Sequence, residues 1–419
     1  MRAAQPIAHY AGIPAKGMSL EVVMRSLLAA IAGIAVAMPA YAQSLAVAVE
    51  AAWKRQPLAQ ARAARAEEFA ARRAAALAFF PEPPSLVIGN RDDRLHRDQG
   101  AREMSAGIAL PLWLPGEQGR QHAIVSTEHD QFDAVLVAAK LKVAGEVRDA
   151  YWQVRLAQSE LVLGRRKVEE AAVLEADVAR RVNAGDLARV DLNQAQAAER
   201  LARSGLAESE IRAFRASQGF SVLTGLTTLP DGKENLVTPA LTVDGHPLLV
   251  ALQQAVVTTQ ARLDLAAHSL RNNPELELGL RRERGQFDAP YGHSLEVRFR
   301  FPFATDARNK PRIAAANAEM IEAQAVYSLE RARVAAEIEA ARHELEQART
   351  VVQLTQARFA FAVDTQRLLA KAFALGELDL ISRLRAENER FEAELNFTRA
   401  SIEASRAVSR LNQVQGMLP

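Results

Sequence analysis

The sequence repeats itself with an offset of about 190 residues, and this constrains the fold more than any other feature. Residues 106–115 correspond to residues 297–306, and residues 144–154 correspond to residues 335–345. An internal repeat that covers nearly the whole chain indicates a tandem duplication. The chain should therefore build the same set of elements twice.

Each copy has the same predicted order of a helix, two strands, a very long helix and a return helix. Alanine, leucine and charged residues dominate the long stretches, which favours helices. We expect repeat 1 at 43–224, with a helix at about 45–80, strands at about 85–92 and 101–113, and a helical hairpin at 117–224. We expect repeat 2 at 246–419, with a helix at 246–272, strands at about 275–283 and 293–303, and a hairpin at 308–416. Residues 225–245 form the linker.

Small and aliphatic residues follow a 4-3 spacing along both long helices. This spacing is typical of coiled coils, and the small members allow helices to approach closely. Helices of this length are not stable alone in water, so each must pack against neighbours. The seam residues are Val143, Val147, Ala150, Val154, Ala157 and Leu161 in the first copy, and Val334, Ile338, Ala341, Leu345, Ala348 and Val352 in the second.

The last predicted strand alternates strictly between apolar and polar residues. Val297, Phe299, Phe301 and Phe303 should lie on one face, and Glu296, Arg298 and Arg300 on the other. Strands of this length can cross a bilayer at a tilt, with the first set facing lipid and the second lining a water-filled lumen. Four strands cannot close a barrel, so three chains would supply twelve. A soluble hairpin packed on helices is the alternative.

The N-terminal segment resembles an export signal. Residues 24–43 contain an arginine, an apolar run and a small-residue end at Ala40-Tyr41-Ala42. We therefore expect a signal peptide at 1–42, with Met1, Met18 or Met24 as the start of translation. A membrane anchor is the alternative.

Composition excludes several classes of function. The chain has no cysteine, which excludes disulfides and thiolate metal sites. Its 52 basic and 50 acidic residues nearly balance, so nothing favours nucleic-acid binding. No phosphate-binding loop, catalytic nucleophile motif or ligand-like spacing of the eight histidines occurs. We expect neither an enzyme nor a cofactor or metal site.

The whole pattern resembles the TolC-like outer-membrane efflux channels. The resemblance covers residues 43–419 and is most specific at the two helix turns, "ARRVNAGDLARVDLNQAQ" (179–196) and "AKAFALGELDLISRLRAE" (370–387). It implies a mainly helical fold with a long coiled-coil α-barrel and four transmembrane strands per protomer, forming a twelve-stranded barrel in a homotrimer. It also implies an exit duct in the outer membrane, with a large periplasmic extension. Its partners would be outer-membrane lipid, a periplasmic adaptor and an inner-membrane pump of the resistance-nodulation-division type.

The resemblance assigns roles to the residues of the two turns. The adaptor would dock at Ala184, Gly185, Asp186 and Leu187, and at Leu375, Gly376, Glu377 and Leu378. The periplasmic aperture would be formed by Asp191, Gln194, Ser382 and Arg385. The family often has aspartates after the second turn, where this chain has Ser382 and Arg385. An acidic ring at the aperture is therefore in doubt, and an ion-paired closure is the alternative.

The sequence indicates the transported cargo less specifically than it indicates the fold. The segment "LPLWLPGEQGRQ" (110–121) and the short chain termini resemble most the branch that exports heavy-metal cations of the cobalt–zinc–cadmium or nickel type. Multidrug efflux and type I secretion channels share the same pattern. A periplasmic adaptor or a coiled-coil scaffold fits less well, because neither needs duplicated strands.

Overall fold

The computed structural model describes residues 44–95, 98–230, 234–237 and 242–419. The predicted signal peptide lies outside the described residues, as do parts of the linker. The elements of the first half are α2 (Leu45–Arg55), α3 (Pro57–Gln60), α4 (Arg62–Ala76), β1 (Ser85–Asp92), β2 (Arg102–Pro111), α5 (Glu117–Ala184) and α6 (Arg189–Thr224). Those of the second half are η1 (Val243–Gly245), α7 (Pro247–His268), β3 (Glu275–Arg284), β4 (Gly292–Arg300), α8 (Asp306–Ala374) and α9 (Leu380–Val414).

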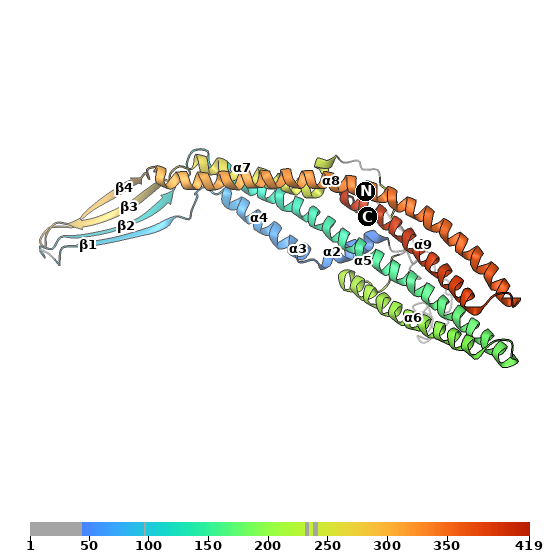
Figure 1. Cartoon of the computed structure of the whole chain (residues 1–419). Coiled ribbons are helices and arrows are strands. Elements are labelled where there is room, and N and C mark those ends of the chain that lie inside the picture. The colour runs from blue at the N-terminus through green and yellow to red at the C-terminus, as the bar shows by residue number, and fades with distance from the viewer. Residues whose placement is uncertain (1–43, 96–97, 231–233, 238–241) are drawn as a thin grey trace, which may run out of the picture. The chain divides into compact units, whose positions relative to one another are not determined.

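The long helices form two antiparallel pairs. Helix α5, with 68 residues, runs beside α6, and α8, with 69 residues, runs beside α9 (Figure 1). Helix α5 also contacts α7 and α9, and α7 contacts α8. The helices of the two halves of the chain therefore pack directly against each other. All twelve predicted seam residues are buried or half-buried, which confirms the 4-3 pattern as the packing surface.

The first predicted helix, about 45–80, is wrong as a single element. It is broken into α2, α3 and α4, because Gln56 precedes Pro57 and takes an extended conformation with φ −70° and ψ 136°. The ring of a proline disfavours the helical conformation in the residue before it. Pro57 then begins α3, where its missing N–H leaves no helical hydrogen bond unmade.

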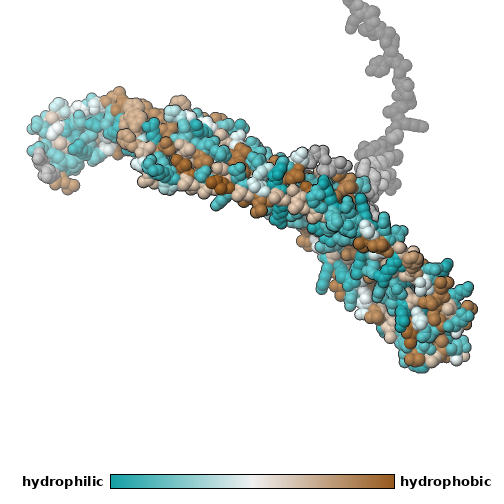
Figure 2. Space-filling model, turned by 45° about the horizontal axis from the view of Figure 1, so that its top comes forward, coloured by the Kyte–Doolittle hydropathy of each residue, from teal (hydrophilic) through white to brown (hydrophobic). Residues whose placement is uncertain are grey.

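The four strands form one antiparallel sheet in the order β1-β2-β3-β4. The central pairing joins the two halves of the chain, with Gly107 of β2 opposite Gly279 of β3. Figure 2 shows hydrophilic residues over the loop end of the sheet, with hydrophobic and hydrophilic residues interspersed along the helices. None of the helices in the described ranges is long and apolar enough to cross a membrane.

Two predicted strands extend too far. Strand β2 ends at Pro111 and β4 ends at Arg300, whereas the sequence predicted 113 and 303. Pro302 has no N–H with which to continue the ladder. Phe301 and Phe303 therefore follow the strand instead of belonging to it, although both are exposed and Phe301 stacks on Phe299 with ring centroids 6.0 Å apart.

Candidate functional site: the sheet and the helix turns

One face of the sheet is apolar and open. The register places Val297 beside Leu278, and Leu278 beside Ile108, so these side chains form a row across three strands. Phe299, 55% exposed, continues this face toward the strand end. The exposed apolar residues of this face are Leu86, Ile88, Met104, Ile108, Leu278, Leu280, Leu295, Val297 and Phe299. An apolar area of this kind on a soluble monomer is unusual and marks a surface that contacts lipid or protein.

The opposite face carries a network of ion pairs. Arg298 bridges Glu277 at 2.9 Å and Glu296 at 2.6 Å. Arg281 bridges the same Glu296 at 2.8 Å, so the three strands β2, β3 and β4 are linked through Arg281 and its second partner, Glu103. Arg300 pairs with Glu275 at 3.1 Å. The predicted lumen residues Glu296, Arg298 and Arg300 thus share one polar face.

The sequence reasoning missed most of the partners on β3. Glu275, Glu277 and Arg281 alternate with the leucines of "ELELGLR" (275–281), which is the same period-two signal as in β4. Within the described sheet, β1 and β4 are edge strands with no partner on one side. Open edges present unpaired backbone N–H and C=O groups, with which further strands can pair.

The two helix turns have nearly the same geometry. Gly185 and Gly376 take left-handed conformations, with φ +87° and +78°. The N–H of Asp186 reaches the carbonyl of Arg181 at 2.9 Å, and the N–H of Glu377 reaches that of Ala372 at 3.0 Å. These bonds satisfy carbonyls at the helix ends, which is why glycine is placed there.

The predicted docking residues divide into two groups. Ala184, Gly185, Asp186, Leu375, Gly376 and Glu377 are exposed. Leu187 and Leu378 are half-buried and pack against a small core between the hairpins, made by Leu174, Val178, Ala195, Phe373 and Leu380. The two leucines therefore have a structural role in anchoring each turn to the helices beneath it.

The predicted aperture residues have uneven surroundings. The Asp191 carboxylate accepts a hydrogen bond from the N–H of Ala188 at 3.0 Å and so caps its own helix. Gln194 is half-buried, with a side-chain oxygen that has no hydrogen-bond partner among the described residues. Ser382 is half-buried, whereas Arg385 is exposed.

Asp379 is an acidic residue at the turn that the sequence reasoning missed. Its carboxylate caps α9 by accepting a hydrogen bond from the N–H of Ser382 at 3.1 Å. Hydrogen bonds from Ser382, together with the nearby charge of Arg385, lower the pKa of Asp379 below its ordinary value. An aspartate just before the return helix is a typical N-cap signal and could have been recognised from the sequence.

Phe373 joins the two hairpins at the turns. It is 1% exposed, and the guanidinium carbons of Arg181 and Arg383 lie 5.1 and 5.0 Å from its ring centroid. Arg181 comes from α5 and Arg383 from α9, so one aromatic ring is contacted by cations from both halves of the chain. Such cation–π contacts help to hold the two hairpins together at the turns.

No candidate metal site accompanies these surfaces. The described part of the chain contains no group of three or more histidine, cysteine, aspartate or glutamate residues that could hold an ion. The Nε2 of His122, on α5, lies 3.3 Å from the Nε of Arg73.

Comparisons with known proteins agree with this architecture. The sequence profile of the outer membrane efflux protein family matches residues 47–226. Solved structures with the same fold include the Campylobacter jejuni CmeC outer membrane channel, at 14% identity and a TM-score of 0.72, covering 89% of this chain and 85% of that one. Residues 47–226 are thus similar to outer membrane efflux proteins, and the fold of the chain is that of the solved outer-membrane channels.

Two further structures show that the likeness extends over the full fold. The outer membrane protein VceC of Vibrio cholerae has 15% identity and a TM-score of 0.71, with coverage of 89% of this chain and 96% of that chain. The structure of CusC has 16% identity and a TM-score of 0.73, with coverage of 89% and 92%. Among curated proteins, no sequence matches this chain.

Proposed function

We propose that the chain is the outer-membrane exit duct of a tripartite efflux system and works as a homotrimer. The observation that carries this proposal is the four-stranded sheet, which has one apolar face, one ion-paired face and two open edges. Three copies joined edge to edge would give twelve strands, with the apolar face toward lipid and the Arg298 face toward water. The polar face would then line the barrel lumen.

Exposed stripes on the helices support self-association. Leu354, Phe361 and Leu368 recur every seven residues along α8, Leu375 follows at its C-cap, and all four are more than half exposed. Helix α6 carries a second exposed set that includes Val190, Leu201, Ile211 and Phe214. Seven-residue spacing is the pattern of a helix that packs against another helix. Side-by-side copies would cover both stripes and extend the helices into a tunnel.

The exposed turns would receive the other components of the system. Gly185 and Gly376 have open space around their Cα atoms, and Asp186 and Glu377 point their charges into solvent beside them. We propose that a periplasmic adaptor docks on these two similar turns and that an inner-membrane resistance-nodulation-division pump feeds the duct. Asp191, Gln194, Ser382 and Arg385 would surround the aperture, which closes through the cation–π contacts on Phe373.

We further propose divalent heavy-metal cations as the cargo, on the resemblance of residues 110–121 to that branch and the likeness to CusC. The experiment is a tolerance panel for a deletion strain, with zinc, cobalt, cadmium, nickel, copper and silver beside dyes, detergents and antibiotics. Sensitivity to divalent metals that the intact gene reverses is the expected result. Sensitivity to organic compounds alone would show that the cargo is drugs and not metals. No sensitivity at all would point to a redundant duct or to secretion.

The same strain tests the turns directly. Glu377→Arg should fail to restore tolerance, because the charge of an exposed docking residue is reversed. Glu389→Arg, an exposed residue further along α9, is the matched control and should restore it. Equal complementation by both variants would contradict docking at this turn.

A further inference from the structure

The arginines on the two faces of the sheet have different surroundings. Those described above on the polar face all form ion pairs with glutamates of the sheet. The apolar face also has arginines, near the loop end of β2 and β3, and these form no ion pair with any carboxylate in the part of the chain that the structure describes. They are Arg102, Arg282 and Arg284, here called the arginine cluster.

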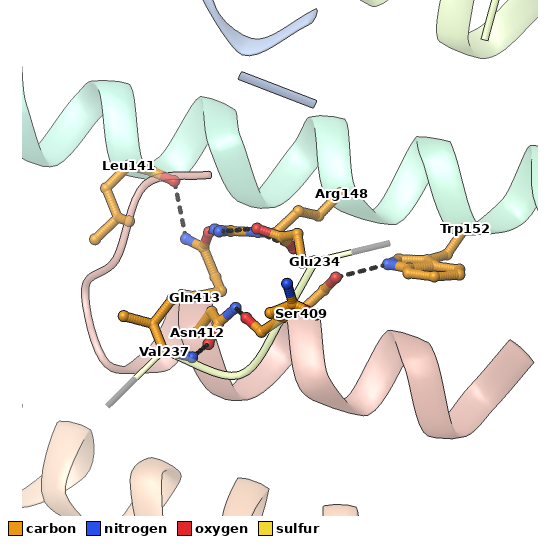
Figure 3. Close-up of polar contacts among 9 residues, drawn as sticks. Leu141, Arg148, Trp152, Glu234, Val237, Ser409, Asn412 and Gln413 are labelled. Carbon is orange, nitrogen blue, oxygen red and sulfur yellow. Dashed lines mark hydrogen bonds and ion pairs between the residues drawn. The ribbon is translucent and has the colours of Figure 1, made fainter. Parts of the chain in front are cut away.

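A buried arginine elsewhere in the fold shows what a guanidinium needs when it is removed from water. Arg148 of α5, which is 3% exposed, donates to both carboxylate oxygens of Glu234, at 2.9 and 2.6 Å (Figure 3). A charge that leaves water is costly unless it is paired. If lipid covers the apolar face of the sheet, the arginine cluster therefore needs an anion from outside the chain.

The arginine cluster lies at the border of the apolar area. The last apolar pair of β3 and β4 on this face is Leu280 with Leu295, and Arg282 follows on the same face two residues further along β3. Two residues of a strand span about 7 Å. Arg102 and Arg284 form the next pair on this face, closer to the loops. An amphiphile with apolar chains on the leucines would thus have its polar end at the arginines.

An aromatic ring and the backbone of a loop hold the cluster in place. The guanidinium carbons of Arg282 and Arg284 lie 4.1 and 5.0 Å from the ring centroid of Tyr291. The Nε of Arg284 also donates to the carbonyl of Gly100 at 3.1 Å, which ties the β1–β2 loop to β3. A ring is not a conventional hydrogen-bond acceptor, so the remaining N–H groups of both arginines are available to an external anion.

A neighbouring copy of the chain does not supply this anion. Arg102 is on β2 and the other two arginines are on β3, which are the central strands of the sheet. Copies joined edge to edge would pair through β1 and β4 and leave the central strands uncovered on this face. Asp92 of β1 lies opposite Arg102 in the register, but its carboxylate is 3.9 Å from the Nε of Arg94.

We propose that the arginine cluster binds the phosphate groups of lipid A, the phosphorylated glycolipid of the outer leaflet of the outer membrane. The inference rests on the proposed function, which sets the apolar face against lipid and the helices on the periplasmic side. All connections between the helices and the sheet lie at the end away from the loops, so the cluster would face the outer leaflet (Figure 1).

The chemistry of lipid A fits the cluster. Its phosphates are attached to sugars that lie next to the acyl chains, so one molecule presents both an apolar and an anionic part. The planar N–H donors of arginine match the oxygens of phosphate. Basic side chains at the border of a membrane recognise anionic head groups in this way.

Native mass spectrometry of the full-length protein in a non-ionic detergent tests this proposal. The probes are diphosphoryl lipid A and monophosphoryl lipid A with the same acyl chains, so that they differ only in a phosphate. The protein should bind the diphosphoryl form more tightly, because its extra charge meets the arginines. Equal affinity for the two lipids would overturn the proposal.

Variants locate the site on the apolar face. Arg282→Gln should weaken the binding of diphosphoryl lipid A about fivefold, the change expected for one arginine near an anionic lipid surface. Arg91→Gln is the matched control and should bind as the parent does, because Arg91 lies on the opposite face, beside Glu103. Arg102→Gln repeats the test if Arg282→Gln does not fold. Equal losses in the variant and the control, or no loss in either, would reject the site.

Inorganic phosphate distinguishes a lipid site from a site for free phosphate. At the concentration of the lipid it should leave the lipid bound, because the acyl chains add contacts with the apolar face. Displacement at that concentration would reject lipid A as the ligand.

Binding in detergent does not depend on transport. A protein that fails the tolerance panel yet prefers diphosphoryl lipid A would refute the proposed efflux function and retain the lipid site. A working duct without this preference would refute the lipid site alone.

Discussion

At the residue scale, Gln413 reaches the backbone of α5 because residue 145 has no side chain. A Cβ at Gly145 would lie 3.1 Å from the Gln413 amide, which is tighter than ordinary van der Waals contact. Glycine has a low helical propensity and so destabilises α5 at this position. The hydrogen bond from Gln413 to the carbonyl of Leu141, which the glycine permits, offsets this cost.

Gly145→Ala should therefore destabilise the protein, whereas Gly219→Ala should not. The first change displaces a buried hydrogen bond worth about 1–3 kcal/mol, against a gain of about 1 kcal/mol in helical propensity. Gly219 has open space around it, so its replacement by alanine brings only the gain in helical propensity. Urea unfolding of both variants measures the difference, and a Gly145→Ala variant as stable as Gly219→Ala would contradict the packing argument.

His246 makes stability depend on pH. Its Nδ1 accepts the N–H of Leu248 at 3.2 Å at the start of α7, and burial lowers its pKa although Glu337 opposes this. Because the folded pKa lies below the unfolded value of about 6.5, the unfolded chain binds the proton more readily. The contribution of His246 is complete above the unfolded pKa and is lost as the pH falls through the folded pKa.

His246→Asn should make stability less sensitive to acid in this range. Asparagine can cap the helix without titrating, whereas His246→Ala should cost about 1 kcal/mol at neutral pH by removing the cap. Unfolding free energies measured between pH 7.5 and 5 compare the three proteins. Parallel pH profiles for His246→Asn and the parent would show that this histidine does not titrate on unfolding.

At the element scale, the sheet separates two environments on its two faces. The side chain of Val297 extends the exposed apolar row, and that of its neighbour Arg298 joins the ion pairs. Adjacent residues of a strand point to opposite faces of the sheet. Neighbouring side chains of β4 therefore lie in different environments, one apolar and one charged.

Val297→Arg should therefore impair assembly in the outer membrane far more than Arg298→Gln. An arginine on the lipid face near the middle of a bilayer costs about 2–4 kcal/mol, while glutamine on a wet face leaves its glutamate partners solvated. The measurement is the fraction of protein recovered folded in the outer membrane. Similar recovery of the two variants would mean that the apolar face does not meet lipid.

At the scale of the whole molecule, the exposed stripe on α8 predicts association. Phe361 is 75% exposed, the highest value among the stripe residues. Phe361→Glu should weaken the proposed trimer by about 2 kcal/mol per protomer, the value expected of a hot-spot residue at the centre of an interface. Gln356→Glu, exposed on another side of the same helix, is the control. Native mass spectrometry resolves the species, and a Phe361→Glu trimer as stable as the parent would place the interface elsewhere.

The sequence by itself determined the order of elements, the seams of the long helices and the positions of both turns. These follow from local rules: 4-3 spacing, period-two alternation, and glycine where the backbone must be left-handed. Local rules also explain two wrong predictions. Hydrophobic periodicity alone predicted a continuous first helix and a strand to residue 303, but Pro57 and Pro302 end these elements earlier. Asp379 was missed for the opposite reason, because its capping signal was present and was not used.

Only the tertiary structure decided which distant residues meet. Three sets of contacts join residues that are 86 to 192 positions apart: the Arg148–Glu234 pair, the hydrogen bonds of Asn412 with Asn235 and Val237, and the contact of Arg181 with Phe373. No periodicity encodes such pairs, because each depends on how whole helices are rotated and offset when their seams pack. The sequence determines which charged and amide side chains are present. The packing of the helices determines which of them lie close enough to pair in the protein interior.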